Sequence, residues 1–487
     1  MTISPSVRRS RALALLFASA LALPGCATAP DLGASSPPGS KALAKSQASF
    51  QASAAQASWP ADAWWRTYGD PQLDALIDQA LAGSPDMAQA AARVRSAEAA
   101  AQQTGAARLP SLSGNARASQ VKQSQNNGVP AAFVPDGWQD TGQATLDLAW
   151  ELDFWGKNRK ALDAALSSAE AARADAAQAR LVLAASVATA YGDFARLHAD
   201  RDAAVDALAA RDATLKLIAQ RAAEGLETAA AVKRAESGRA TAAADLAAVD
   251  EQLSLTRNRI AALVGLGPDR GISLRRPVQP TLREVGLPAH LQADLLGRRP
   301  DLAAARLRAE AAAGRVGVAR ADFYPNIRLS GLIGVQSLGL DMLTKAGSGY
   351  GSVGPAISLP IFSGGRLEGA YRGARAEYDL AVASYDATLV RALQDVADVA
   401  ASQAALAPRL DNSRLALDAA KAAHDLALAR YRGGLSTYLD VLAAEDALIA
   451  ARRTVAGLET RAFTLDIALA KALGGGFQAR APNASPV

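Results

Sequence analysis

The stretch RYRGGLSTYLDVLAAE, residues 430–445, marks a sharp turn between two helical patterns. Gly433 and Gly434 end the first pattern, because glycine readily takes the left-handed conformation that closes a helix. Ser436 and Thr437 follow at positions where a side-chain oxygen can cap the next helix. The stretch therefore predicts the tip of a helical hairpin.

A weaker copy of this turn lies earlier in the chain, where residues 221–236 read RAAEGLETAAAVKRAE. Gly225 precedes Gly434 by the same number of residues as Gly265 precedes Gly474. Gly265 and Gly474 end the helices that follow the two turns. Repetition at one spacing indicates an internal duplication. We expect each half of the chain to contain a helix, two strands, a long helix, a tip and a final helix. Other matched positions are Pro85 with Pro300, Leu109-Pro110 with Tyr324-Pro325, and Phe154 with Phe362.

Long helices are predicted around each turn. Residues 156–224 lack proline and have a helix-forming composition over about 69 residues, which would extend roughly 100 Å. After the second turn, apolar side chains recur every seventh residue through Val441, Leu448 and Val455, as in a coiled coil. Pro408 lies inside the second long helical pattern, where we expect it to kink or break the helix.

Four short segments have the alternating pattern of β-strands, at about 109–121, 141–152, 325–336 and 352–361. Each has roughly the ~9–11 residues that cross a bilayer obliquely. Four strands cannot close into a barrel, and an open sheet edge is not stable in lipid, so such a chain needs further copies. The aromatic residues at the strand ends suit a membrane interface or, alternatively, a soluble sheet-to-helix junction. They are Trp150, Phe154, Trp155, Phe323, Tyr324 and Phe362.

The N-terminus has the pattern of a bacterial secretion signal. Arginines within residues 8–11 precede the apolar run 12–23, which is too short to span a membrane as a helix. LPGC at residues 23–26 resembles a lipobox, in which the cysteine becomes the acylated first residue of a lipoprotein. This resemblance implies N-palmitoyl and S-diacylglycerol groups on Cys26, and Ala27 after it implies release to the outer membrane. The alternative is an ordinary secreted protein with one stray thiol.

Composition argues against several classes of function. Lys and Arg total 52 and Asp and Glu total 47, so the net charge of +5 is small for 487 residues and gives little support for nucleic-acid binding. The three histidines, His198, His290 and His424, are isolated, and no Gly-rich phosphate loop or metal-ligand spacing occurs in the sequence. We therefore expect neither an enzyme nor a metal or cofactor site apart from the lipid.

Short motifs are spread through the chain in a fixed order. They are WW at 64–65, DPQL at 70–73, SPD at 84–86, WELDFWG at 150–156, PIF at 360–362, GGR at 364–366, Tyr431 with GL at 434–435, and YLDVL at 438–442. Together they resemble the outer-membrane factors of tripartite efflux pumps over about residues 59–475. The NodT/OprM-like lipoprotein branch is the nearest in pattern, and TolC is more distant.

This resemblance implies a fold and a function. The fold is mostly α with a membrane β portion, in which three copies form a twelve-stranded outer-membrane barrel continued by a periplasmic α-helical cylinder. The function is an exit duct for drugs or other small toxic compounds. Its partners are a periplasmic adaptor (membrane fusion protein), outer-membrane lipid and an inner-membrane transporter, which we expect to be of the resistance-nodulation-division type.

The resemblance also implies functional residues. The tips, where family members meet the adaptor, correspond to Gly225, Leu226 and the run Gly433, Gly434, Leu435 and Ser436. Asp440 matches an acidic gate position, where three copies would form a ring of carboxylates that favours cations. Its counterpart in the first repeat is Ala231, so a single ring is expected. An ordinary acid stabilised by the helix N-terminus is the simpler alternative for Asp440.

The expected organisation follows from these patterns. We expect a signal peptide at 1–25, a lipidated flexible tether at 26–58, repeats at 59–268 and 289–475, a linker at 269–288 and a disordered tail at 476–487. Two other functions stay open: a duct for type I protein secretion, and a lipid-anchored periplasmic coiled-coil scaffold, which would have no need of membrane-length strands.

Overall fold

The computed structural model describes residues 58–126, 128–278 and 291–479. Cys26, the signal peptide, nearly all of the tether, the linker from residue 279, and the tail from residue 480 lie outside the described residues.

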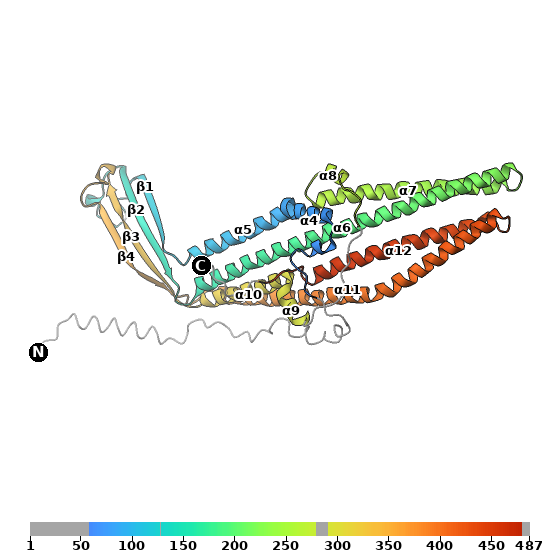
Figure 1. The fold of residues 1–487 in the computed structure, drawn as a ribbon. Helices are drawn as coiled ribbons and strands as arrows, with labels where there is room; N and C mark the ends of the chain where they lie inside the picture. Colours follow the sequence, from blue (N-terminus) through green and yellow to red (C-terminus); the bar gives the residue numbers. More distant parts are fainter. Residues whose placement is uncertain (1–57, 127, 279–290, 480–487) are drawn as a thin grey trace. The chain divides into compact units, whose positions relative to one another are not determined.

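Helices of equal length recur in the two halves of the chain (Figure 1). The first helix of each repeat has 22 residues, the long helix has 67 and the helix after the tip has 35. These matching lengths agree with a duplication. The pairs are α5 (Pro85–Ala106) with α10 (Pro300–Ala321), α6 (Lys157–Ala223) with α11 (Arg366–Arg432), and α7 (Ala229–Leu263) with α12 (Tyr438–Ala472).

Shorter elements precede or connect these helices. They are a 3-10 segment (Trp64–Tyr68), α4 (Pro71–Gly83), α8 (Asp269–Ile272) and α9 (Leu291–Arg298). The start of α4 shows how local sequence sets a boundary, since Pro71 occupies the first turn and the Asp70 carboxylate accepts a 2.8 Å hydrogen bond from the Gln72 N–H.

Helix α11 continues through Pro408, so of the two expected effects of this proline, a kink or a break, the break is excluded. Proline removes only one backbone donor, and the cooperative hydrogen bonding of a 67-residue helix outweighs that local loss. The side-chain amide of Asn412 donates to the Pro408 carbonyl at 2.7 Å.

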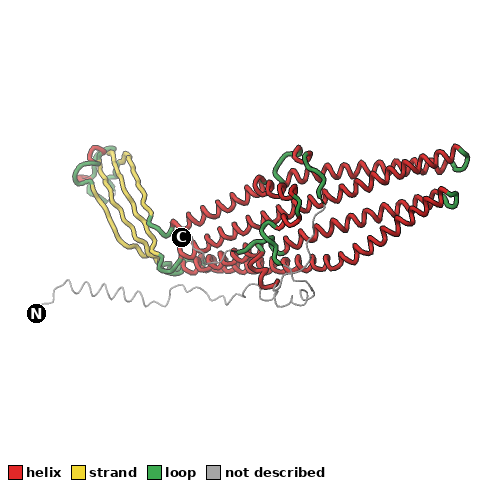
Figure 2. Tube along the Cα trace, in the orientation of Figure 1, coloured by secondary structure: helices red, strands yellow, loops and turns green. Residues whose placement is uncertain are grey.

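The four strands, which are yellow in Figure 2, form one antiparallel sheet, and their order is β1-β2-β3-β4. The pairing of β2 with β3 joins the two repeats directly, with Leu146 opposite Ile333. The strands are β1 (Ser111–Val121), β2 (Gln139–Leu152), β3 (Asn326–Leu338) and β4 (Gly349–Ser358).

The register separates polar from apolar side chains. One face is almost entirely apolar, and several of its side chains are largely exposed, with Leu112 at 69%, Ile333 at 67% and Val353 at 80%. The opposite face is mostly polar, with Leu332 as an exception. The apolar face includes Leu112, Leu146, Leu148, Trp150, Leu152, Ile327, Leu329, Ile333, Val335, Val353 and Ile357, and the polar face includes Asn115, Arg117, Gln143, Thr145, Asp147, Glu151, Arg328, Ser330, Gln336, Tyr350 and Ser352.

The described chain divides into two compact units that cut across the repeats. One contains residues 95–170 and 306–383, which include the whole sheet. The other contains the described parts of 38–94, 171–305 and 384–487, which include both hairpin turns. A large core of the second unit packs Trp64, Leu73 and Phe194 together with many neighbours.

The aromatic residues at the strand ends divide into two groups. Phe154 and Phe362 are 65% and 91% exposed, as an interfacial role requires. Phe323 is buried and packs against Leu367 and Tyr371, so its expected interfacial role is wrong. The Trp155 ring stacks on Tyr324 at 4.8 Å between centroids and therefore also contributes to the junction.

Within the described residues, no helix combines the length and the apolar character that crossing a membrane requires.

Candidate functional site at the hairpin tips

The two turns have the same backbone structure. Gly225 and Gly434 both have φ 73°, which places them in the left-handed region. The N–H of Leu226 donates to the Arg221 carbonyl, and the N–H of Leu435 donates to the Arg430 carbonyl, each at 2.8 Å. These bonds satisfy carbonyl groups that a helix end otherwise leaves without partners. The same ending therefore closes α6 and α11.

Each tip exposes apolar side chains. Leu226 is 62% exposed, Leu435 is 73% exposed and Leu439, one turn into α12, is 51% exposed. Large apolar side chains gathered at the end of a structure are typical of a contact surface for another protein. Ser436 differs, because its hydroxyl is buried and has no hydrogen-bond partner among the described residues.

A small apolar core beneath the turns joins the two hairpins. Ile218 of α6 and Ala231 and Ala235 of α7 pack against Tyr431 of α11 and Val441 of α12. Ala231 corresponds by repeat to Asp440 and is 4% exposed, so the two equivalent positions have different surroundings. The hairpins therefore end as one packed cluster, which also contains Tyr438.

Polar contacts to Tyr431 reinforce this cluster. Its hydroxyl donates to Glu227 in the first turn at 3.0 Å, and its carbonyl accepts from the Arg221 guanidinium at 3.4 Å. That guanidinium also lies 5.0 Å from the centre of the Tyr431 ring, in cation–π contact. Burial, followed by the bond to Glu227, raises the pKa of Tyr431 to about 12. The tyrosine therefore stays protonated and keeps its donor at neutral pH.

Asp440 lies in the first turn of α12 and is exposed. Its Oδ2 accepts hydrogen bonds from the N–H and the hydroxyl of Thr437, both at 2.9 Å. These bonds hold the pKa of Asp440 below its usual value, so the carboxylate is ionised at neutral pH. The geometry gives Asp440 a role in capping its own helix, and the charge stays accessible to water.

Sequence patterns missed the polar contacts between the hairpins. Glu227 lies in the first turn, where the sequence pattern assigned only Gly225 and Leu226 to the tip. Arg211 of α6 and Glu445 of α12 are 6% and 4% exposed and lie 3.4 Å apart. A signal for Glu445 was present, because it interrupts the buried stripe formed by Tyr438, Val441 and Leu448. A lone acid in such a stripe indicates a buried polar contact.

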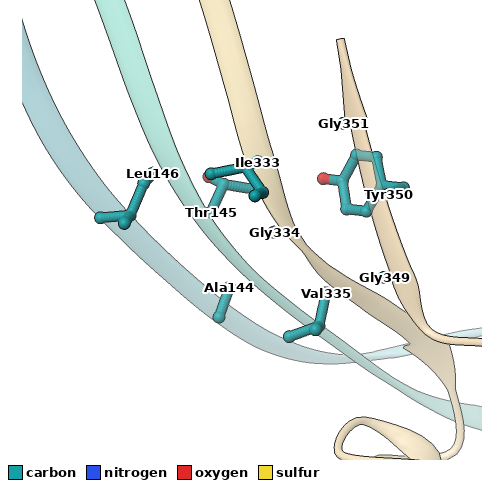
Figure 3. Close-up of a pocket in the computed structure, with 9 residues that line it drawn as sticks. All are labelled: Ala144, Thr145, Leu146, Ile333, Gly334, Val335, Gly349, Tyr350 and Gly351. Atoms are coloured by element: carbon teal, nitrogen blue, oxygen red, sulfur yellow. The ribbon is translucent and has the colours of Figure 1, made fainter. Parts of the chain in front are cut away.

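The sheet carries an open groove of about 800 Å³ across β2, β3 and β4 (Figure 3). Its walls include Leu146, Ile333 and Val335, which belong to the apolar face, and glycines reduce the side-chain volume between them. The groove is apolar, like the sheet face around it. We therefore treat it as part of that surface.

In the part of the chain that the structure describes, no group of three or more His, Cys, Asp or Glu side chains is placed to hold a metal ion.

Three comparisons with known proteins agree with one another. The sequence pattern of the family described as "Outer membrane efflux protein" matches residues 76–266 and 291–475. The "Fusaric acid resistance protein FusA" of Burkholderia cepacia is 38% identical over 374 residues, 75% of this chain and 69% of the relative. The "Multidrug resistance outer membrane protein MdtP" of Escherichia coli K12 is 30% identical over 432 residues, 87% of this chain and 88% of the relative.

The fold is similar to a solved structure. The crystal structure of the outer membrane protein VceC from Vibrio cholerae superposes with a TM-score of 0.81 and 45% sequence identity. The match covers 86% of this chain and 100% of that chain.

Proposed function

The chain belongs to the outer membrane efflux protein family, and from this premise we propose that three copies assemble into the exit duct of a tripartite efflux pump. The protein is an outer membrane channel that exports drugs or other toxic compounds. It works with a periplasmic adaptor and an inner-membrane transporter. We infer that the transporter is of the resistance-nodulation-division type.

The two-faced sheet is the single observation that carries this function. Its exposed apolar face suits lipid, and its polar face suits a water-filled lumen. Within the described chain β1 and β4 each pair with one strand only, which leaves two free edges. An unpaired edge is very costly in lipid, so the edges must meet those of other copies. Three copies supply twelve strands, an even number as in other bacterial barrels.

An exposed stripe on α11 supports assembly of the helices as well. Its members are separated alternately by four and three residues, the spacing of a coiled-coil seam. Most are small or apolar, and all are exposed, with Leu415 at 67% and Leu426 at 61%. We assign this stripe to contact with a second copy. It consists of Ala401, Ala405, Pro408, Asn412, Leu415, Ala419, Ala422, Leu426 and Ala429.

The tips are the proposed contact with the adaptor. Leu226 and Leu435 present apolar side chains next to Gly225, Gly433 and Gly434, which leave the turn backbone accessible. A helical hairpin of the adaptor could bury these leucines against its own apolar stripe, since such stripes are how helices associate.

Asp440 is the proposed gate residue. Its carboxylate is exposed and ionised, so three copies around one axis would form a ring of negative charge that favours cations. Its bonds to Thr437 hold the carboxylate in a defined position.

Deletion of the gene tests the function. We expect lower resistance to a panel of drugs, restored by the wild-type gene, together with unchanged secretion of proteins by type I systems. Unchanged drug susceptibility with a loss of secreted protein would instead favour the secretion duct.

A further inference from the structure

Charged side chains are few on the polar face of the sheet. Within the described strands this face carries two cations and two acids, namely Arg117, Arg328, Asp147 and Glu151. Glu151 lies directly opposite Arg328 in the register of β2 with β3, and Nη2 of Arg328 is 3.8 Å from Oε2 of Glu151. The charge of Arg328 is therefore compensated within the sheet, whereas the other cation, Arg117 of β1, requires separate consideration.

Arg117 has no acid close to it. Its side chain is exposed and makes no ion pair or hydrogen bond with any described residue, and its partner across the strand pair is the uncharged Gln143. The acid on the same face of β2 is Asp147, four residues and about 13 Å along the strand from Gln143. Oδ2 of Asp147 instead accepts hydrogen bonds from the Asn115 amide at 2.8 Å and the Thr145 hydroxyl at 2.9 Å.

Assembly would not supply an acid from the neighbouring strand. In a closed ring of copies, the free edge of β1 meets the free edge of β4 of the next copy. The sequence of β4 is GYGSVGPAIS, which contains no charged residue, so no register of this contact gives Arg117 a carboxylate from β4. Three copies would therefore place three uncompensated guanidinium groups around a water-filled lumen.

Arg117 lies toward the end of the sheet that is remote from the helices. Helix α5 precedes β1 and helix α6 follows β2, so the remote end is the one at Val121 and Gln139. Arg117 is four residues before Val121, which is about 13 Å along the strand. In the proposed channel this end is the outer mouth, so an anion that enters from outside meets Arg117 before it meets Asp147.

We propose that Arg117 forms an anion-selecting ring in the barrel, which favours small organic solutes that carry carboxylate groups. A guanidinium can bind a carboxylate through two parallel hydrogen bonds. Water solvates an exposed guanidinium, so each contact is weak, and passage requires attraction without trapping. Arg117 is therefore a specificity-determining residue of the channel. This inference rests on the proposed channel function.

Block of single-channel current by citrate, a tricarboxylate, tests the ring in the full-length protein in planar bilayers, with citrate added to each side in turn. Arg117→Gln removes the charge, so we expect the half-blocking concentration of citrate to rise by about threefold or more. Arg117→Lys keeps the charge without the planar guanidinium and should retain most of the block. Reversal potentials in a KCl gradient should show a stronger cation preference in Arg117→Gln and little change in Arg117→Lys.

The matched control is Lys122→Gln, which removes an exposed cation just beyond the end of β1 and should leave both measurements unchanged. The charge of Asp440 is the same in all of these proteins. Equal weakening of the block by Lys122→Gln would show a general effect of charge at the mouth and overturn the ring. Unchanged block in a conducting Arg117→Gln channel would overturn it as well. A wild-type protein that conducts no current would instead overturn the channel function itself, and the ring with it.

Discussion

Tyr431 and Asp440 lie on either side of one turn and are held in different ways. Tyr431 is buried and reaches across to Glu227 of the other hairpin, whereas Asp440 is exposed and accepts hydrogen bonds from Thr437 at the start of its own helix. The sequence motif identified both residues. It could not distinguish a gate from a helix cap for Asp440, because both roles use an acid at this position.

Charge and capping at Asp440 can be separated by substitution. Asp440→Asn removes the charge but keeps an oxygen that can accept from Thr437, so we expect weaker cation preference and higher conductance with α12 intact. Thr437→Val removes the hydroxyl donor but keeps the charge, so cation preference should persist. Reversal potentials in a salt gradient measure this preference. Equal preference in wild type and Asp440→Asn would refute the gate role.

The contact of Tyr431 with Glu227 predicts a local effect. Tyr431→Phe keeps the ring in the core and removes one hydrogen bond, which should destabilise the joined tips by about 1 kcal/mol. Hydrogen exchange of the turn amides should become faster, with no change in the sheet. Because the pKa of Tyr431 is raised from 10.0 to about 12, the contribution is fully present below pH 10 and is lost as pH rises through 12. Equal exchange in both proteins up to pH 9 would contradict this contact.

At the scale of elements, periodic patterns were the most reliable guide. Heptads and composition predicted the long helices, glycines and capping residues predicted the hairpin turns, and the repeat predicted twin elements whose lengths agree. Pro408 does not end its helix, because the cooperative hydrogen bonding of the long helix around it outweighs the local cost. The burial of Phe323 depends on Leu367 and Tyr371, which are distant in sequence and carry no local signal.

Close packing at Gly334 of β3 gives a prediction about the sheet. A Cβ there would lie 2.3 Å from the Ala144 carbonyl oxygen and 2.9 Å from the Thr145 Cα, so Gly334→Ala forces β2 and β3 apart. We expect a clear loss of folded protein in the outer membrane. Gly354→Ala in β4 is the control, because nothing lies within 4 Å of its added Cβ. Equal yields of the two variants would argue against the tight pairing of β2 with β3.

At the scale of the whole molecule, the duplication explains why one chain has four strands and two hairpins. The pairing of β2 with β3 joins the repeats into one sheet and leaves free edges at β1 and β4. Sequence could predict the need for partner copies from strand number alone. The amphipathic register and the exposed stripe on α11 required the structure.

The lipid anchor belongs to this scale, because it concerns where the assembly resides. Cys26→Ser should abolish incorporation of radioactive palmitate, since the thiol is the proposed attachment point and the chain has a single cysteine. Retained label would contradict the lipoprotein assignment. The sheet should still direct the variant to the outer membrane, as membrane fractionation would test.

Native mass spectrometry of the full-length protein, extracted from outer membranes in mild detergent, tests the three-copy channel most directly. We predict a dominant species of three processed chains, each with the added mass of its lipid groups. A dominant monomer would contradict the account, because a single four-stranded sheet with free edges could not form a closed channel in lipid.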